Sequence, residues 1–305
     1  VGLGNFLRFP VLAAQHGGGA FMIPYFISLI LLGIPLMWIE WTAGRYGGGY
    51  EHSTAPGIFH TLWEKNRFIK YFGVIGIFGP LVILIYYIYI ESWTLAYSFF
   101  SLTGRYASCL DQKSMQNFLL GFQCLQKNEY FTNIWWAYLF FLITFALNMA
   151  IIYKGITMGI EKFCKYAMPV LFVFGILIVV RVLSLGAPVP QRPGWSSING
   201  LGFFWNPDFS ALKSAKVWLA AAGQIFFTLS VGIGVILTYA SYLSKGDDVA
   251  LSGLTATATN EFAEVILGGS IVITSAFVFL GPLGTKEVAA SGAFNLAFVT
   301  MPLVF

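Results

Sequence analysis

Polar side chains gather on three otherwise apolar stretches of the chain: Asn5 on the first, Gln224, Thr228 and Ser230 on the second, and Asn260, Glu261 and Glu264 on the third. A spacing of four places Gln224 with Thr228, and Asn260 with Glu264, on one face of a helix each. Amide and hydroxyl oxygens are hard ligands, which suit an alkali cation better than a transition metal. These residues therefore predict a cation site within the apolar part of the protein.

Two pairs of glycines interrupt apolar segments, at Gly2 and Gly4 and again at Gly232 and Gly234. On either side of the second pair, the apolar run is shorter than the roughly 20 residues that a membrane helix needs. Irregular backbone at membrane depth occurs only where protein covers it or where it lines a cavity. Paired interrupted segments therefore indicate the central binding site of a transporter. The alternative interpretation is that these glycines only allow close helix packing.

The composition sets the class of protein. Of the 305 residues, 57% are hydrophobic and 10% are charged, whereas about a quarter of an average soluble domain is charged. The net charge of +4 is small and dispersed, which argues against a nucleic-acid partner. Apolar blocks recur along the whole chain, so we expect an all-α protein that crosses the membrane several times and contacts lipid.

The elements that must position the polar residues are apolar helices. The pattern predicts a partial helix to about residue 15 and full spans near 20–44, 68–101, 131–153, 161–185, 216–243 and 251–280. Basic residues in the loops 45–70 and 154–165 place those loops in the cytoplasm. Cys109 and Cys124 share the outer loop 102–130, where they either form a disulfide or stay free.

One acidic residue, Glu40, lies inside the first full span. A carboxylate in the middle of a membrane costs about 2.5–3.5 kcal/mol even on lenient scales, so it needs a partner. The amides that a broken helix leaves free are suitable donors. We therefore expect Glu40 to support one of the two breaks.

With these residues assembled, the sequence resembles the neurotransmitter:sodium symporter family, most closely its bacterial leucine-transporter branch. The motifs are Gly4-Asn5-Phe6-Leu7-Arg8-Phe9-Pro10, Gly17-Gly18-Gly19-Ala20-Phe21, Ile85-Tyr86-Tyr87, Gly223-Gln224-Ile225-Phe226-Phe227-Thr228-Leu229-Ser230 and Asn260-Glu261-Phe262-Ala263-Glu264. The resemblance implies an inverted-repeat fold with discontinuous helices 1 and 6. Residues 1–305 would be a single, partial transporter domain, which begins within helix 1 and ends in the outer loop after helix 7.

The resemblance implies sodium-coupled symport of a small neutral amino acid by alternating access, in the inner (plasma) membrane of the cell. Neither enzymatic activity nor an organic cofactor is expected. At a first sodium site the family uses side chains that match Asn5, Thr228 and Asn260, and at a second site a carbonyl that matches Val1. The substrate would be held by positions that match Leu3, Gly4, Ile83, Tyr87, Phe227, Thr228, Ser230 and Ile233. Phe227 would also close the site, and Arg8 would belong to the outer gate.

Several positions depart from relatives within the family. Ile83 replaces a valine and Ile233 a phenylalanine of the leucine transporter, so the preferred side chain does not follow from the resemblance. Gly2 stands where monoamine transporters have an aspartate, which implies that the ligand brings its own carboxylate. Chloride-dependent members bind the anion near positions that match Tyr25, Gln224 and Thr228, with a serine at the position of Glu264. We expect the Glu264 carboxylate to substitute for chloride.

Two other functions share these features. One is proton- or sodium-coupled transport of another small solute through the same broken-helix core. The other is a non-transporting amino acid sensor or a fragment. The oligomeric state does not follow from the sequence.

Overall fold

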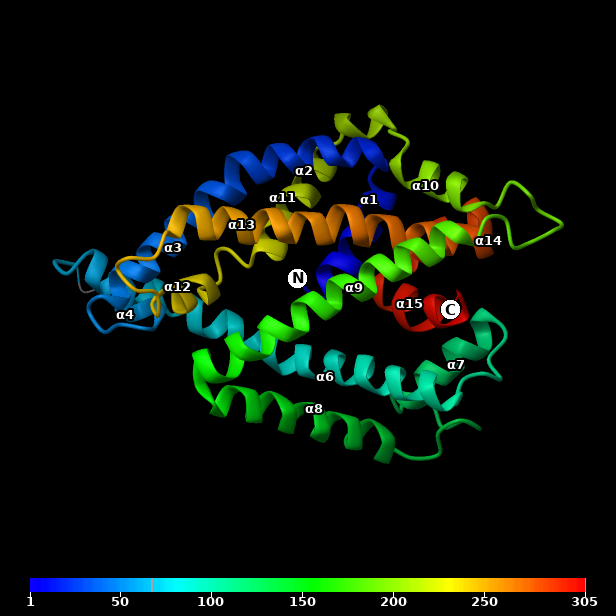
Figure 1. The fold of residues 1–305 in the computed structure, drawn as a ribbon, viewed down its shortest axis with the longest axis horizontal. Helices are drawn as coiled ribbons and strands as arrows, with labels where there is room; N and C mark the ends of the chain where they lie inside the picture. The colour runs from blue at the N-terminus through cyan, green and yellow to red at the C-terminus, as the bar shows by residue number, and fades with distance from the viewer. Residues whose placement is uncertain (67, 305) are drawn as a thin grey trace. The chain divides into compact units, whose positions relative to one another are not determined.

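The structure is a computed structural model that describes residues 1–66 and 68–304, so Arg67 and Phe305 lie outside the described residues. Within this range the regular secondary structure is helical, apart from a single bridge between Gly18 and Pro207. Figure 1 shows the helices in chain order. The prediction of an all-α fold is confirmed.

The chain forms two compact units, each assembled from separate stretches of sequence. Unit 1 contains residues 1–5, 16–84 and 205–266. Its helices are η2 (Gly19–Phe21), α2 (Met22–Ser28), η3 (Leu29–Gly33), α3 (Ile34–Gly48), α4 (Ala55–Leu62), α5 (Ile69–Phe72), the first part of α6 (Ile75–Thr103), η5 (Phe209–Lys213), α11 (Ala215–Leu229), α12 (Val235–Ala240) and α13 (Val249–Glu261).

Unit 2 contains residues 6–15, 85–204 and 267–305. Its helices are α1 (Phe9–Gln15), the second part of α6, α7 (Gln112–Phe122), α8 (Trp135–Tyr153), η4 (Ile156–Glu161), α9 (Lys162–Ser184), α10 (Ser197–Trp205), α14 (Gly269–Ser291), α15 (Ala293–Asn295), η7 (Leu296–Thr300) and α16 (Met301–Val304). Two π-helical segments, η1 (Gly4–Arg8) and η6 (Phe262–Gly268), continue from one unit into the other.

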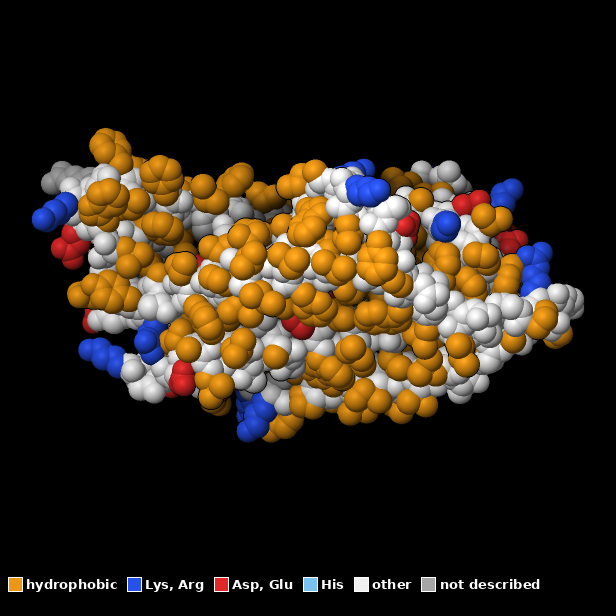
Figure 2. Space-filling view, turned by 90° about the horizontal axis from the view of Figure 1, so that it is seen from above, with side chains coloured by type: hydrophobic (Ala, Val, Ile, Leu, Met, Phe, Trp, Pro, Cys, Tyr) orange, Lys and Arg blue, Asp and Glu red, His pale blue; other side chains and the backbone are white. Residues whose placement is uncertain are grey.

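Among the described residues, five helical runs are long and apolar enough to cross a membrane: Gly19–Gly48, Ile69–Thr103, Trp135–Tyr153, Ile156–Ser184 and Val249–Ser291. These runs contain the predicted spans 20–44 and 251–280, and most of the predicted spans 68–101, 131–153 and 161–185. Hydrophobic side chains cover most of the face in Figure 2, and charged side chains form small groups on it. Such a surface fits a lipid environment, and the prediction of a membrane protein is confirmed.

In unit 1, the half-helix α12 packs closely on α3 because glycines leave room for its backbone (Figure 1). A Cβ on Gly44 would lie 2.4 Å from the Leu237 carbonyl oxygen, and one on Gly48 would lie 1.9 Å from the Ser241 carbonyl oxygen. Small residues at these positions let the two backbones touch, as is common between membrane helices. This contact fixes the short α12 beside a full-length helix.

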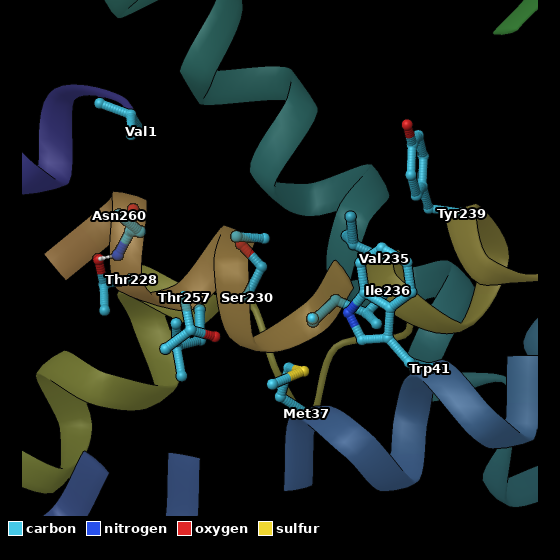
Figure 3. Close-up of a pocket in the computed structure, with 13 residues that line it drawn as sticks. Val1, Met37, Trp41, Thr228, Ser230, Val235, Ile236, Tyr239, Thr257 and Asn260 are labelled. Carbon is cyan, nitrogen blue, oxygen red and sulfur yellow. Dashed lines mark hydrogen bonds between the residues drawn. The ribbon is translucent and has the colours of Figure 1, made fainter. Parts of the chain in front are cut away.

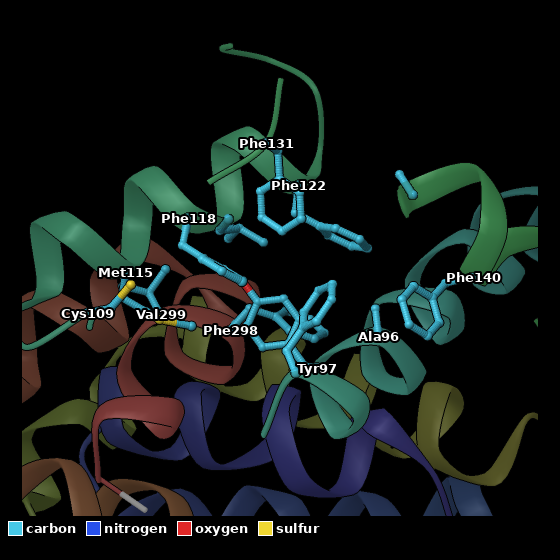
Figure 4. Packing of buried hydrophobic residues seen from close by; sticks show 13 residues of the cluster. Ala96, Tyr97, Cys109, Met115, Phe118, Phe122, Phe131, Phe140, Phe298 and Val299 are labelled. Carbon is cyan, nitrogen blue, oxygen red and sulfur yellow. The ribbon is translucent and has the colours of Figure 1, made fainter. Parts of the chain in front are cut away.

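In unit 2, an aromatic core joins α6, α7 and α8. Figure 4 shows Phe118 and Phe122 of α7 directed toward Tyr97 of α6, and the rings of Tyr97 and Phe118 meet edge to face at 5.9 Å. Asp111 caps α7, since its Oδ1 accepts a hydrogen bond of 2.6 Å from the Ser114 amide. That amide and the Ser114 hydroxyl lower the pKa of the Asp111 carboxyl. Cys109 is buried here and Cys124 is exposed, and both thiols are free.

Candidate functional site

The sixth apolar segment is broken at the predicted position. α11 ends at Leu229, and Ser230 adopts a left-handed conformation with φ of 55°. Gly232 and Gly234 also have positive φ, of 84° and 81°. Glycine populates this region without the steric penalty that a Cβ brings, so the sequence ends one half-helix and starts the next within a few residues. The prediction of a discontinuous segment here is confirmed.

The first segment begins its helix only at Gly4, after an irregular start. The Gly2 amide donates to Asn5 Oδ1 at 2.8 Å, and the Asn5 amide donates to the Gly2 carbonyl at 3.2 Å. Gly4 lies directly against the ring of Phe227, because a Cβ on Gly4 would be 2.5 Å from Phe227 Cε1. The start of the first segment and the end of α11 are therefore neighbours in unit 1.

Asn5, Thr228 and Asn260 meet beside these breaks. Asn5 Nδ2 lies 2.9 Å from Asn260 Oδ1 and 3.3 Å from Thr228 Oγ1. Asn260 Nδ2 donates to Thr228 Oγ1 at 2.8 Å, and this bond is drawn in Figure 3. Asn5 and Asn260 are only 4% and 7% exposed. Three segments that are far apart in the sequence thus deliver amide and hydroxyl groups to one buried point.

Glu264 lies at the centre of the same network and is fully buried. Its Oε1 accepts from Gln224 Nε2 at 2.7 Å, and its Oε2 accepts from Asn5 Nδ2 at 2.9 Å and from the Thr228 hydroxyl. The Tyr25 hydroxyl lies 3.1 Å from Glu264 Oε1. Glu264 thus accepts hydrogen bonds from three side chains that come from two distant segments.

A second carboxylate, Glu261, belongs to the same network. Its Oε2 lies 2.6 Å from the Tyr25 hydroxyl, whereas its Oε1 is buried without a hydrogen-bond partner. Tyr25 thus bridges Glu261 and Glu264, which are three residues apart on one helix face. The spacing of the two acids was visible in the sequence, but Tyr25 comes from a distant segment. No local pattern connects it to them.

Glu40 accepts a hydrogen bond of 2.5 Å from the Gly232 amide through its Oε1. The donor belongs to the irregular stretch between α11 and α12, and Glu40 serves as the acceptor of its amide. Its other oxygen, Oε2, is buried without a partner. The structure thus brings Glu40 to the sixth-segment break.

A cavity of about 280 Å³ opens beside the polar cluster (Figure 3). Four of the predicted site residues line it: Val1, Thr228, Ser230 and Asn260. Its other wall is apolar and comes from residues that sequence reasoning missed, among them Met37, Trp41, Ile236 and Tyr239. Their spacing, Met37 to Trp41 and Ile236 to Tyr239, marks one face of α3 and one of α12. That signal is also typical of ordinary helix packing.

The remaining predicted residues are Ile83 and Ile233 in unit 1 and Tyr87 and Arg8 in unit 2. Ile83 is on the part of α6 that belongs to unit 1, and Ile233 lies next to Gly79 of that helix. Tyr87 and Arg8 belong to unit 2. Tyr87 contacts Tyr86 edge to face at 6.4 Å.

The donor set favours an alkali cation over a transition metal. Among the residues that the structure describes, no three His, Cys, Asp or Glu side chains cluster in a way that could hold a metal ion. The meeting point of Asn5, Thr228 and Asn260 supplies hard oxygen ligands, and Glu264 supplies charge. A membrane segment broken between α11 and α12, with a buried polar site beside the break, is typical of a helical membrane protein of the transporter class.

The chain belongs to the sodium:neurotransmitter symporter family, whose model matches residues 1–133 and 124–305. It is 33% identical over 303 residues to an uncharacterized sodium-dependent transporter of Methanocaldococcus jannaschii, which covers 99% of this chain and 58% of that relative. It is 26% identical over 285 residues to the sodium-dependent neutral amino acid transporter B(0)AT1 of Mus musculus, with 87% of this chain and 42% of that protein covered.

A solved structure, that of MhsT in complex with L-phenylalanine, matches with a TM-score of 0.79 and 32% identity. The match covers 100% of this chain and 62% of that chain. This chain therefore spans less than two thirds of the length of each of these proteins. The resemblance to the family and the leucine-transporter type of fold are both confirmed.

Proposed function

We propose that the full-length protein couples uptake of a neutral amino acid to sodium by alternating access, in the inner (plasma) membrane of the cell. One observation carries the proposal: Asn5, Thr228 and Asn260 converge on a buried point next to two helix breaks. Membership of a sodium symporter family supports sodium as the coupled ion. Residues 1–305 would form one continuous part of the transporter domain.

The three converging side chains would bind the first sodium ion. Their mutual distances of 2.8–3.3 Å mean that modest rotation of the two amides can turn several oxygens toward one ion. Glu264 offsets the positive charge, which lowers the cost of burying a cation. The carbonyl of Val1, at the edge of the cavity, would contribute to a second sodium site.

The substrate would lie at the start of the first helix. The amides of Leu3 and Gly4 precede or open η1, where unpaired amides carry partial positive charge and favour a carboxylate. Tyr87 would donate a further hydrogen bond to that carboxylate. Phe227, which packs on Gly4, would cover the substrate, and Arg8 would close the outer side. Thr228 and Ser230 lie at the end of α11, where free carbonyls suit the amino group of the substrate.

The class of substrate follows from charge. Gly2 and the other residues around the first break carry no acidic side chain that could pair with a lone amine. A ligand with its own carboxylate and amino group would satisfy both the amides at the start of η1 and the carbonyls at the end of α11. MhsT was solved with L-phenylalanine, and the mouse relative is a neutral amino acid transporter. Both support a neutral amino acid.

Chloride is not required in this proposal. The donors that would face a chloride ion, Gln224 and Thr228, are already bonded to the Glu264 carboxylate. An added anion would meet like charge in a buried site of low dielectric.

Uptake by the full-length protein in proteoliposomes tests the function. With an inward sodium gradient, labelled alanine, leucine or phenylalanine should accumulate, whereas an equal potassium gradient should give none. Unlabelled glutamate and lysine, which carry net charge, are the matched competitors and should not inhibit. Uptake that ignores sodium, or that a proton gradient alone drives, would contradict the proposal.

A further inference from the structure

The first half of α6 presents one narrow face to the rest of unit 1. Gly76, Gly79 and Ile83 are partly buried, whereas the neighbouring Phe78 and Leu81 are 63% and 52% exposed. Spacings of three and four residues place the three partly buried positions on one side of the helix. Gly76 and Gly79 carry no side chain, so this face projects little from the helix backbone at these two positions.

This face of α6 lies against the break between α11 and α12. A Cβ on Gly76 would lie 3.2 Å from Gly234 Cα, and a Cβ on Gly234 would lie 2.5 Å from Gly76 Cα. The two backbones therefore touch at this pair of glycines. The contact fixes how closely the residues of the break, Ile233 included, approach α6.

Gly79, one turn further along, has a different environment. A Cβ at this position would come within 4 Å of a single described residue, Ile233, at 3.8 Å from its Cβ and 4.0 Å from its carbonyl oxygen. These are ordinary van der Waals distances, so a larger side chain would occupy open space instead of striking the backbone. The next turn of the same face carries Ile83. Gly79 thus leaves open space beside Ile233, on the face of α6 that carries Ile83. Both isoleucines are candidate contacts of the substrate side chain.

We propose that Gly79 is a specificity-determining position: its missing side chain leaves open space beside Ile233, on the helix face that carries Ile83, and this space admits large apolar side chains of neutral amino acids. The inference rests on the proposed function. Its physical basis is that apolar surface of the substrate is buried where glycine leaves room, and that a pocket rejects a side chain it cannot hold. A side chain at position 79 should therefore cost affinity for large substrates and spare small ones.

The test compares full-length wild type, Gly79→Ala and Gly79→Val by the competition of unlabelled alanine, valine, leucine and phenylalanine against a labelled substrate. Gly79→Ala should lower the affinity for phenylalanine relative to alanine by about tenfold, and Gly79→Val should lower it further, since one methylene changes selectivity by about 10–200-fold. Alanine is also the better helix former, so Gly79→Ala should fold. Ile233→Val, which removes a methyl from the opposite wall, should shift the ratio toward phenylalanine.

Gly223→Ala is the matched control, because a Cβ there meets nothing within 4 Å among the described residues and lies on a different helix, α11. It should leave the ratio unchanged. Equal phenylalanine-to-alanine ratios in wild type, Gly79→Ala and Ile233→Val would overturn the role of Gly79. Absence of sodium-driven amino acid uptake in wild type would instead overturn the proposed function, so the two failures are distinguishable.

Discussion

Replacing Glu264 by serine should make transport depend on chloride. Glu264 is fully buried and holds the Gln224 and Asn5 side-chain amides at 2.7 and 2.9 Å. Serine is too short to reach these donors and carries no charge. In the variant, the hydrogen bonds that Gln224 and Asn5 donate to this carboxylate would be lost, at a cost of about 1–3 kcal/mol each. A chloride ion could accept from both and restore the negative charge beside sodium.

The magnitude follows from Coulomb's law. In wild type, a chloride ion held by the same donors would lie about 4 Å from the carboxylate, and the repulsion at an effective dielectric constant of 20 is about 4 kcal/mol. That energy corresponds to about a thousandfold in chloride affinity. Wild type should therefore not bind chloride at physiological concentration, whereas the Glu264→Ser variant should bind it.

The assay is sodium-driven uptake in gluconate medium with chloride added stepwise. Wild type should give one rate throughout, and Glu264→Ser should be slow in gluconate and recover with chloride. Glu261→Gln alters the other acid of the same helix, three residues away, and should stay independent of chloride. The reasoning is refuted if wild type needs chloride, or if the serine variant is equally active with and without it.

Three further results are expected. Tyr87→Phe would remove the hydrogen bond proposed to reach the substrate carboxylate and should weaken substrate binding by about ten- to a hundredfold, measured by displacement of a labelled amino acid. Glu40→Ala leaves the Gly232 amide without its acceptor and should raise hydrogen exchange across residues 230–234, whereas Glu40→Gln, which keeps an acceptor, should not. The lowered pKa of Asp111 stabilises α7 above the usual carboxyl pKa of about 3.9, and this stabilisation is lost as the pH falls below it. Exchange of the α7 amides should therefore rise on acidification in wild type and change less in Asp111→Asn.

The membrane helices and the break in the sixth segment could be predicted because both depend on local sequence. A run of about 20 apolar residues specifies a spanning helix, and glycines such as Gly232 and Gly234 mark where it must open. Helical spacing alone predicted that Asn260 and Glu264 lie on one face of a helix. Each of these inferences needed only residues within a few turns of each other.

The interactions between distant segments could not be predicted in this way. Tyr25 and Glu261 are 236 residues apart, and only the folded chain brings their oxygens to 2.6 Å. Met37 and Trp41 line the cavity, but their apolar spacing is equally typical of a packed helix. Whether such a residue packs against another helix or lines a cavity depends on tertiary packing, which local patterns do not encode.

Some helical structure was missed in segments expected to be loops. The outer loop 102–130 contains α7, whose Met115, Phe118 and Phe122 are buried. Their spacing of three and four is amphipathic, and it could have identified the helix. The predicted span ends at residue 280, where Gly281 has a positive φ and kinks α14, but the helix continues after the kink to Ser291. Proline is tolerated in the first turn of a helix, so Pro282 is compatible with the helical residues that follow it.

The central claim, that Asn5, Thr228 and Asn260 bind one sodium ion, is tested most directly by the sodium concentration that gives half-maximal substrate binding to the purified full-length protein. Asn260→Ala removes one oxygen ligand and should raise that concentration by about ten- to a hundredfold, as expected for losing an interaction with a charged group. Asn117→Ala, on the exposed side of α7, is the control and should leave it unchanged. An unaltered sodium requirement in Asn260→Ala would contradict the account.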